Sequence, residues 1–275
     1  MMKISVIIPT YKPQDYLWEC LDSLVKQSFP KEEFEVILVL NGCTEPYKSA
    51  INQYIAEKMQ DMNVNFIHTD VGGVSNARNL ALDQVRGEFV TFIDDDDFVS
   101  VKYLELLYEK ADSETISLCY PHAFNDGDVE TAVPYPMRNV YEDLHDKNNI
   151  RISSKVRKYF SGPWMKLIPM NFIQGRRFNK EFAIGEDALF MFLISDCFEK
   201  FSFANKEAIY YRRFRQNSAI TTRRNRRAVL KNSLRLIWNY SCIYMRNVLS
   251  YNMCFYFTRV LGSVKVMLSI FKQKI

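Results

Sequence analysis

The chain has 275 residues, is 48% hydrophobic and 14% aromatic, and contains only nine prolines and nine glycines, which excludes a disordered or fibrous protein. Its length allows one large domain or two small ones. The six cysteines form no C-x-x-C pair and the three histidines are far apart, so we expect neither a zinc site nor a disulfide framework. We expect buried, reduced cysteines and, because no signal peptide begins the chain, a cytoplasmic protein.

Charge is distributed unevenly along the chain, although the formal net charge is only +4. All 32 Asp and Glu residues precede Ala208, whereas 14 of the 36 Lys and Arg residues lie between Ala208 and Ile275. An acidic body followed by a basic tail indicates that the tail meets an anionic surface.

Apolar runs alternate with helical periodicity in the first part of the chain. The predicted strands are 3–8, 34–40, 64–67 and 88–93, and the predicted helices are 14–27, 46–60 and 73–85. Continuously apolar strands that alternate with helices indicate an α/β fold with a mostly parallel sheet flanked by helices.

The pattern loosens after about residue 111. Prolines and polar residues predict a loop-rich or lid segment over 121–160, followed by a helix over 186–198 and a strand over 207–214. From about residue 222, basic residues including Arg223 and Arg224 alternate with apolar ones, which predicts a basic amphipathic helix. The longest uncharged stretch, 247–258, has twelve residues, whereas a membrane-spanning helix needs roughly 20.

Four consecutive aspartates, Asp94-Asp95-Asp96-Asp97, follow the predicted strand 88–93. Their mutual repulsion is costly unless a cation or a metal–polyphosphate complex binds there. In open α/β sheets, ligands bind at the carboxyl ends of strands, and carboxylate oxygens suit Mg²⁺ or Mn²⁺. The run therefore predicts a metal site, and a solvated turn is the alternative.

Several segments occur in a characteristic order along the chain. They are Val6-Ile7-Ile8-Pro9-Thr10-Tyr11, Val39-Leu40-Asn41-Gly42-Cys43-Thr44-Glu45, Gly73-Val74-Ser75-Asn76-Ala77-Arg78-Asn79, Phe92-Ile93-Asp94-Asp95-Asp96-Asp97 and Gly185-Glu186-Asp187. Their succession resembles the family 2 glycosyltransferases of the GT-A fold over about residues 3–221. Three further segments are similar to recurring family segments: Trp164-Met165-Lys166-Leu167, Tyr210-Tyr211-Arg212-Arg213 and Asn217-Ser218.

The resemblance implies a Rossmann-like GT-A domain over 1–221, followed by a basic helical extension over 222–275. Within the domain, 1–110 is the expected nucleotide-sugar half and 111–221 the expected acceptor half. The implied activity is metal-dependent, inverting transfer of a sugar from a nucleotide-sugar to a hydroxyl of a glycan or lipid-linked acceptor. Bacterial surface polysaccharide synthesis is the expected setting.

The resemblance assigns the nucleotide-sugar to residues at the ends of the first strands. These are Pro9, Thr10, Tyr11, Asn41, Arg78, Asp94 and Asp95. Asn41 and Leu40 replace aspartates that are frequent in the family, which weakens the assignment to uridine, although a UDP-sugar remains the first choice. Arg78 is expected to reach phosphate, and a helix-surface arginine paired with the acidic run is the alternative.

By resemblance, Asp94-x-Asp96 is the DXD motif, with Asp96 as the direct ligand of Mn²⁺ or Mg²⁺ and Asp94 as a second contact. Bound there, a divalent ion stabilises the departing diphosphate as a Lewis acid. For Asp97 we keep two interpretations: a member of the acidic site, or a cap of a following helix.

By resemblance, Asp187 is the base that takes the acceptor proton, and Glu186 is a residue that contacts the acceptor or supports the base; a simple helix-capping pair is the alternative. Trp164 is expected to stack on the acceptor sugar or to belong to the core. Arg212 is expected to hold diphosphate or an acidic acceptor, and a solvated basic face is the alternative.

The basic tail allows two interpretations. It docks on the anionic inner face of the cell membrane, or it packs on the body or on a partner subunit. No nucleic-acid-reading motif accompanies the charge. The alternatives to a glycosyltransferase are a catalytically inactive, membrane-associated binding protein and a sugar nucleotidyltransferase. The latter would need a glycine-rich basic loop after the first strand, where Pro9-Thr10-Tyr11-Lys12-Pro13 stands instead.

Overall fold

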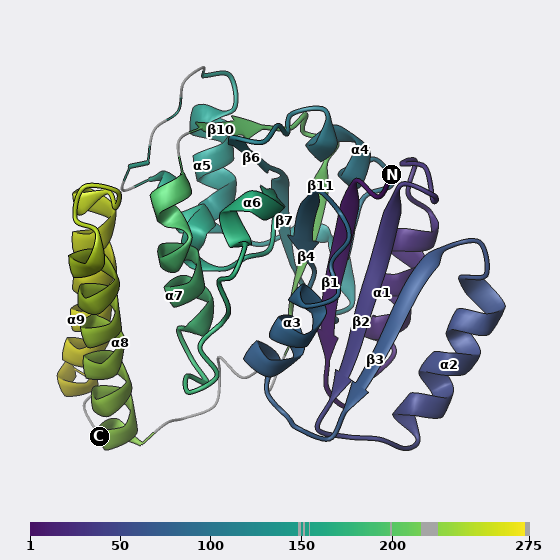
Figure 1. Cartoon of the computed structure of the whole chain (residues 1–275), viewed down its shortest axis with the longest axis horizontal. Helices are drawn as coiled ribbons and strands as arrows, with labels where there is room; N and C mark the ends of the chain where they lie inside the picture. Colours follow the sequence, from purple (N-terminus) through teal and green to yellow (C-terminus); the bar gives the residue numbers. More distant parts are fainter. Residues whose placement is uncertain (148–149, 151, 154, 199, 216–224, 273–275) are drawn as a thin grey trace.

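The computed structural model describes residues 1–147, 150, 152–153, 155–198, 200–215 and 225–272. A seven-stranded sheet has the order β10-β6-β9-β4-β1-β2-β3, and a second, four-stranded sheet has the order β5-β11-β7-β8. Helices flank the large sheet, and the tail forms two long helices at one end of the molecule (Figure 1). The expected α/β fold with a mostly parallel sheet is confirmed.

The first part of the chain alternates strands and helices as predicted. Its elements are β1 (Ile4–Thr10), α1 (Tyr16–Val25), β2 (Phe34–Asn41), α2 (Tyr47–Lys58), β3 (Asn63–Thr69), α3 (Val74–Leu82) and β4 (Phe89–Phe92). Every residue of β1, β2 and β4 is buried, as expected for a covered parallel sheet. Because β1 pairs in parallel with β2 and β4, the carboxyl ends of these three strands meet at one edge.

The second part contains more regular structure than the sequence predicted. Its elements are β5 (Phe98–Val99), α4 (Tyr103–Tyr108), β6 (Thr115–Leu118), β7 (Tyr120–Asn125), β8 (Asp128–Ala132), α5 (Pro136–Leu144), the 3-10 helix η1 (Val156–Ser161), β9 (Lys166–Pro169), α6 (Met170–Ile173), α7 (Glu186–Leu193), the 3-10 helix η2 (Ser195–Cys197), β10 (Lys200–Phe203) and β11 (Ile209–Phe214).

The prediction of a loop-rich segment over 121–160 was wrong for much of its described part. β7 and β8 form an antiparallel hairpin, and Pro136 begins α5 instead of breaking a helix, since a proline at the first helical position loses no hydrogen bond. The polar character of β8 reflects its edge position, where its side chains are largely exposed. The predicted helix over 186–198 ends at Leu193 and continues only as η2.

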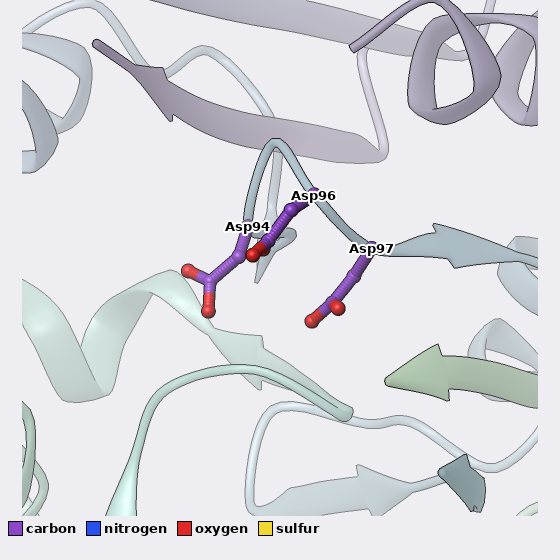
Figure 2. A group of neighbouring side chains, drawn as sticks. All are labelled: Asp94, Asp96 and Asp97. Carbon is purple, nitrogen blue, oxygen red and sulfur yellow. The ribbon is translucent and has the colours of Figure 1, made fainter. Parts of the chain in front are cut away.

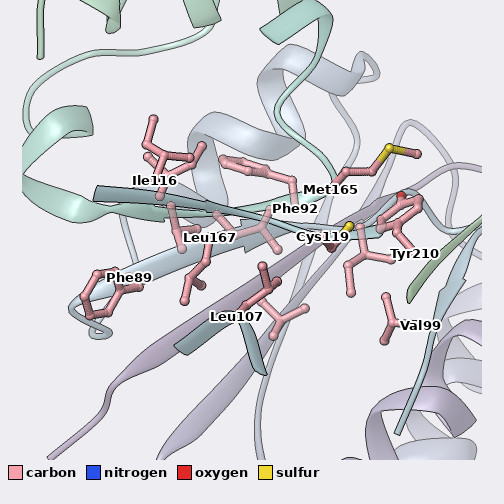
Figure 3. Close-up of a cluster of buried hydrophobic side chains, with 14 of the residues drawn as sticks. Phe89, Phe92, Val99, Leu107, Ile116, Cys119, Met165, Leu167 and Tyr210 are labelled. Atoms are coloured by element: carbon pink, nitrogen blue, oxygen red, sulfur yellow. The ribbon is translucent and has the colours of Figure 1, made fainter. Parts of the chain in front are cut away.

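The hydrophobic core continues from the first part of the chain into the second (Figure 3). Phe89 and Phe92 of β4 lie in one buried cluster with Leu167 of β9 and Tyr210 of β11. This continuity fixes the acidic run after β4 relative to the arginines of β11. The expectation of buried cysteines was wrong for four of the six, because only Cys20 and Cys119 are buried.

The tail consists of α8 (Arg226–Arg246) and α9 (Met253–Lys272). The two helices lie side by side next to α7 (Figure 1). The ring of Phe192 on α7 lies 5.4 Å from that of Tyr240 and 5.7 Å from that of Phe255. Within the residues that the structure describes, no helix has the length and apolar character needed to cross a bilayer. The expected boundary at 221–222, together with Asn217-Ser218, Arg223 and Arg224, lies outside the described residues.

Candidate active site

A pocket of about 620 Å³ lies where β1, β2 and β4 end. The predicted nucleotide-sugar residues that line it are Pro9, Thr10, Tyr11, Asn41, Asp94 and Asp95, and Asp96 joins them. The carboxyl edge of an open α/β sheet is the usual place for a ligand in such a fold. The structure therefore gathers residues from Pro9 to Arg215, from both parts of the chain, into one pocket.

The pocket also contains residues that the sequence analysis missed. Tyr16, Asp70 and Arg215 line it, and the Arg215 guanidinium lies 4.4 Å from the centre of the Tyr16 ring. The Arg215 Nε donates to Asp96 at 2.8 Å, and its Nη2 lies 2.7 Å from the same carboxylate oxygen in an ion pair. Arg215 could have been predicted from the sequence, because it continues the basic segment that includes Arg212. No feature of the neighbouring sequence distinguishes Tyr16 or Asp70 as pocket residues.

Three of the four aspartates turn to one side of their loop. Figure 2 shows the carboxylates of Asp94, Asp96 and Asp97 directed toward a common region, and one oxygen of each lies within 4.8 Å of the others. Asp95 takes a different partner, because its carboxylate accepts a hydrogen bond of 2.5 Å from the Thr10 hydroxyl. The run is therefore partly buried and bonded, which excludes the solvated turn.

Asp97 belongs to the acidic site and caps no helix. Its side chain is fully buried, and β5 follows it directly, with α4 beginning only at Tyr103. It accepts hydrogen bonds of 2.8 Å from the Arg212 Nη1 and from the backbone N–H of Arg213. The helix-cap interpretation was wrong because the partners of Asp97 come from β11, 116 positions along the chain.

Arg78 connects the acidic run to α7. Its side chain is 3% exposed, and its Nη2 and Nη1 donate to Asp94 at 3.0 Å and to Asp187 at 2.5 Å. The interpretation of Arg78 as a helix-surface residue was therefore wrong, although its pairing with the acidic run is confirmed. Arg212 completes the network by donating to the second oxygen of Asp94 at 2.7 Å.

The basic segment of β11 is not a solvated face. The Arg212 side chain is 15% exposed, and Arg213 is 7% exposed. Arg213 donates to Asp126 at 2.7 Å, to the backbone carbonyl of Asp96 at 2.8 Å and to Glu19. That alternative was wrong because the acidic loop after β4 neutralises the arginines.

Burial and neighbouring charges separate the pKa values of the carboxylates. Burial would raise the pKa of Asp94, but the charges of Arg212 and Arg78 outweigh it and lower that pKa. Burial raises the pKa of Asp187 to about 7, with the opposing charge of Arg78 offset in part by Glu186. Burial likewise raises the pKa of Asp95 to about 7. A carboxylate that titrates near neutral pH suits a general base.

Asn41 holds two walls of the pocket together. Its side-chain amide donates to the Thr10 carbonyl at 2.7 Å, and its side-chain oxygen accepts from the Gly73 N–H at 2.8 Å. Behind it the chain approaches closely, because a Cβ at Gly42 would lie 2.8 Å from the Gly72 Cα. The φ of +66° at Gly42 also favours glycine.

Of the residues predicted for the acceptor side, Arg212 lines the pocket, whereas Trp164, Glu186 and Asp187 do not. Trp164 is half-buried, packs on the core and lies 5.3 Å from the Arg212 guanidinium, measured to its ring. Glu186 is 8% exposed, and the Asp187 side chain is 17% exposed. The bond from Asp187 to Arg78 reaches 109 positions along the chain, so Asp187 does more than cap α7.

The acidic group is chemically suited to a hard divalent cation. Asp94, Asp96 and Asp97 offer carboxylate oxygens, the ligands that Mg²⁺ and Mn²⁺ prefer. All three carboxylates accept hydrogen bonds from arginines, but Asp97 is fully buried, whereas Asp94 and Asp96 line the pocket. The residues present therefore fit a metal held by Asp94 and Asp96 on the pocket side.

Comparison with known proteins identifies the class. The family model of glycosyl transferase family 2 matches residues 5–183, so the chain belongs to this family. The fold is also that of solved GT-A structures. Residues 1–349 of TarS from Staphylococcus aureus in complex with UDP-GlcNAc match with a TM-score of 0.71 and 23% identity, over 98% of this chain and 72% of that one.

Further relatives differ in what their names say they act on. The poly(ribitol-phosphate) beta-N-acetylglucosaminyltransferase TarS of S. aureus is 42% identical over 105 residues, which cover 38% of this chain and 18% of TarS. GlyA of Streptococcus pneumoniae is 28% identical over 76% of this chain and 30% of its own length. A mannosyltransferase of Pyrobaculum calidifontis, solved with GDP-Man and Mn²⁺, has a TM-score of 0.59 and 15% identity, covering 99% of this chain and 76% of that one. The matches therefore span less than a third of TarS and GlyA.

Proposed function

We propose that this protein is an inverting glycosyltransferase that moves a sugar from a nucleotide-sugar to a hydroxyl of a glycan or lipid-linked acceptor. The observation that carries the proposal is the double pairing of buried Arg78, which joins Asp94 of the pocket to Asp187 on α7. Displacement at the sugar carbon requires the donor and the base to be held in a fixed relative position, and the Arg78 guanidinium provides this link between the donor pocket and Asp187. Membership of glycosyl transferase family 2 supports the same reaction class.

The donor is assigned to the 620 Å³ pocket. Thr10, Tyr11 and Asn41 would contact base and ribose, and Asp94 and Asp95 would contact the ribose and sugar side. A UDP-sugar is supported by the TarS complex with UDP-GlcNAc, whereas the mannosyltransferase complex holds GDP-Man. Arg212 and Arg215 line the pocket and bring positive charge toward the diphosphate.

Asp96 and Asp94 would hold Mn²⁺ or Mg²⁺, as their position on the pocket side suggests. When bound, such an ion supplies Lewis-acid stabilisation of the departing diphosphate. The mannosyltransferase complex with Mn²⁺ supports this proposal.

Asp187 would take the proton from the acceptor hydroxyl as that oxygen attacks the sugar carbon. Its raised pKa of about 7 favours proton transfer, and the bond to Arg78 fixes its carboxylate. The charge of buried Glu186 contributes to that raised pKa. Trp164, half-buried beside Arg212, would offer a ring face to the acceptor sugar.

We place the reaction in bacterial surface polysaccharide synthesis, and the name of the S. aureus relative TarS, which gives poly(ribitol-phosphate) as what it acts on, supports a bacterial polymer as acceptor. The tail would dock on an anionic membrane surface. Its described helices expose Trp238 at 71% and Leu261 at 63% among basic side chains. The second candidate function is that of a catalytically inactive binding protein. It differs from the glycosyltransferase in one measurable property, because it would bind the nucleotide-sugar without turning it over. Family membership gives no support to a nucleotidyltransferase.

A panel of nucleotide-sugars tests the proposal, first by melting temperature with and without Mn²⁺ and then by release of nucleoside diphosphate. We expect one nucleotide class to raise the melting temperature and to be consumed. Asp96→Ala should reduce turnover at least about 100-fold, since a Lewis acid supplies several kcal/mol. The control is Asp83→Ala, which removes an exposed partner of Arg177 outside the pocket. Donor binding without turnover would favour the inactive binding protein, and undiminished turnover in chelator would refute the metal.

A further inference from the structure

A second cavity lies between the body and the tail helices. It has a volume of about 510 Å³ and is lined by residues of η1, of α8, of α9 and of the segment that begins α7. Small and apolar residues make up much of its walls, among them Ala188, Ala228, Val229 and Leu236. Among the residues that the structure describes, none lines both this groove and the 620 Å³ pocket. We call it the tail groove.

Two arginines line the tail groove without a carboxylate partner. Arg259 of α9 is 6% exposed, donates to the backbone carbonyl of Phe160 and lies 4.6 Å from the ring centre of Phe255. Its Nε is buried and has no hydrogen-bond partner, and the same holds for the Nε of Arg157 on η1. Among the described residues, neither guanidinium forms an ion pair with an acidic side chain.

This arrangement is energetically incomplete. A buried cation is costly unless an anion and hydrogen bonds compensate it. Burial lowers the pKa of Arg259 to about 10, and the nearby charge of Arg157 acts in the same direction. Because that pKa is still well above neutral, Arg259 remains protonated and the groove keeps its positive charge. An anion that accepts from both guanidinium groups would remove the cost.

Gly262 indicates that the groove is kept open. It lies inside the 20-residue helix α9 and lines the groove, and a Cβ built on it would meet no atom within 4 Å. Glycine is among the least favourable residues in a helix interior, and packing does not require it here. Any larger side chain at this position would enter the groove.

We propose that the tail groove binds a phosphate ester that carries a hydrocarbon chain. The phosphate would accept hydrogen bonds from Arg157 and Arg259, since guanidinium groups match phosphate oxygens in geometry and charge. The chain would lie along the apolar walls, with Ser233 and Ser263 as further polar contacts. The site does not depend on the proposed glycosyl transfer. Gly185, which lines the groove, directly precedes Glu186-Asp187 in the chain, although neither Glu186 nor Asp187 lines the groove.

Calorimetric titration of the full chain with octyl phosphate, below its micellar concentration, tests this site. Inorganic phosphate and octyl glucoside serve as probes that lack the chain or the charge. We expect octyl phosphate to bind with one-to-one stoichiometry and at least tenfold more tightly than either. Arg157→Gln and Arg259→Met should each weaken this binding at least tenfold. Arg246→Gln, which removes an exposed arginine at the end of α8 outside the groove, should leave it unchanged.

Gly262→Leu separates binding from folding. This variant keeps both arginines, and its melting temperature should stay the same or rise because leucine favours the helix more than glycine does. It should nevertheless weaken the binding of octyl phosphate at least tenfold, because the leucine side chain fills the groove. Binding of UDP at the other pocket should not change in this variant, so failure of the two proposals can be told apart. The site would be overturned by undetectable octyl phosphate binding, by equal binding of inorganic phosphate or octyl glucoside, or by unaltered binding in Gly262→Leu.

Discussion

Buried or half-buried arginines occur in two regions of this molecule, and their surroundings are opposite. Around the acidic run, Arg78 and Arg212 donate to carboxylates of Asp94, Asp97 and Asp187. In the tail groove, Arg157 and Arg259 lack any such partner among the described residues. A charge compensated by the chain itself holds the fold together, whereas a charge that the chain leaves uncompensated favours an external counterion. The comparison thus separates positioning arginines from ligand-binding ones.

The largest expected effect concerns the compensated region. Asp187→Asn should lower the rate of sugar transfer about 1,000-fold, because a general base contributes about 100- to 10,000-fold. Donor binding should persist, since Asp187 does not line the pocket. Transfer kinetics and UDP titration measure the two quantities.

Asp196→Asn is the matched control for that variant. Asp196 also pairs with an arginine, at 2.7 Å to Arg176, and its side chain is 19% exposed against 17% for Asp187. Its loss should leave transfer unchanged. Normal transfer by Asp187→Asn would remove Asp187 as the base.

The same substitution should have unequal effects on stability in the two regions. Arg78→Met leaves the largely buried Asp187 carboxylate without its arginine and leaves Asp94 paired with Arg212 alone, which costs about 3–5 kcal/mol. Arg259→Met strands no carboxylate, so the loss of one hydrogen bond, about 1 kcal/mol, is offset by removal of an uncompensated charge. Urea unfolding without ligands measures both changes. If the two variants lost a similar amount of unfolding free energy, the two regions would not differ in how their arginines are compensated.

The pH dependence of transfer should follow Asp187. Its pKa is raised to about 7, and a base acts only when deprotonated, so the transfer rate should increase about tenfold per unit below pH 7 and level off above it. Asp95 titrates in the same range. The profile should therefore be measured in Asp95→Asn as well, where the midpoint near pH 7 should persist.

The contribution of Asp187 to stability runs in the opposite direction. Its folded-state pKa of about 7 exceeds the unfolded value of about 3.9, so the unfolded chain loses its proton first as the pH rises. The stability that protonated Asp187 contributes below about pH 4 should be lost between about pH 4 and 7. Asp187→Asn should flatten this decline in melting temperature, and an unchanged slope would contradict the raised pKa.

The strands and the pocket could be predicted because their signals are local. Continuous apolar runs mark β1, β2 and β4, and parallel pairing then brings their carboxyl ends together. The partners of the acidic run could not be predicted in this way. Arg78 meets Asp187 across 109 positions, and Arg212 meets Asp94 across 118. Periodicity carries no information about such contacts. The sequence therefore allowed Asp97 to be interpreted as a helix cap and the arginines of β11 as a solvated basic face, and both interpretations were wrong.

The tail groove shows the same limit more strongly. The sequence marks Arg259 as one basic residue among 14 from Ala208 onward, and it marks Arg157 not at all. Their meeting in one groove depends on how η1, α8 and α9 pack, which amphipathic patterning does not specify. Only the packed structure distinguishes a buried cation without a partner from the exposed cations around it.

The smallest expected effect sharpens that last distinction. Arg246 is an exposed cation of the tail, so Arg246→Gln should weaken binding to anionic vesicles roughly fivefold at low salt and less at high salt. Lys58→Gln, an equally exposed change on α2, should have no effect if the tail makes the contact. Vesicle co-sedimentation measures both variants. Arg246→Gln should leave octyl phosphate binding intact. If this variant lost both vesicle binding and octyl phosphate binding, the tail groove and the exposed basic residues of the tail would form a single binding site.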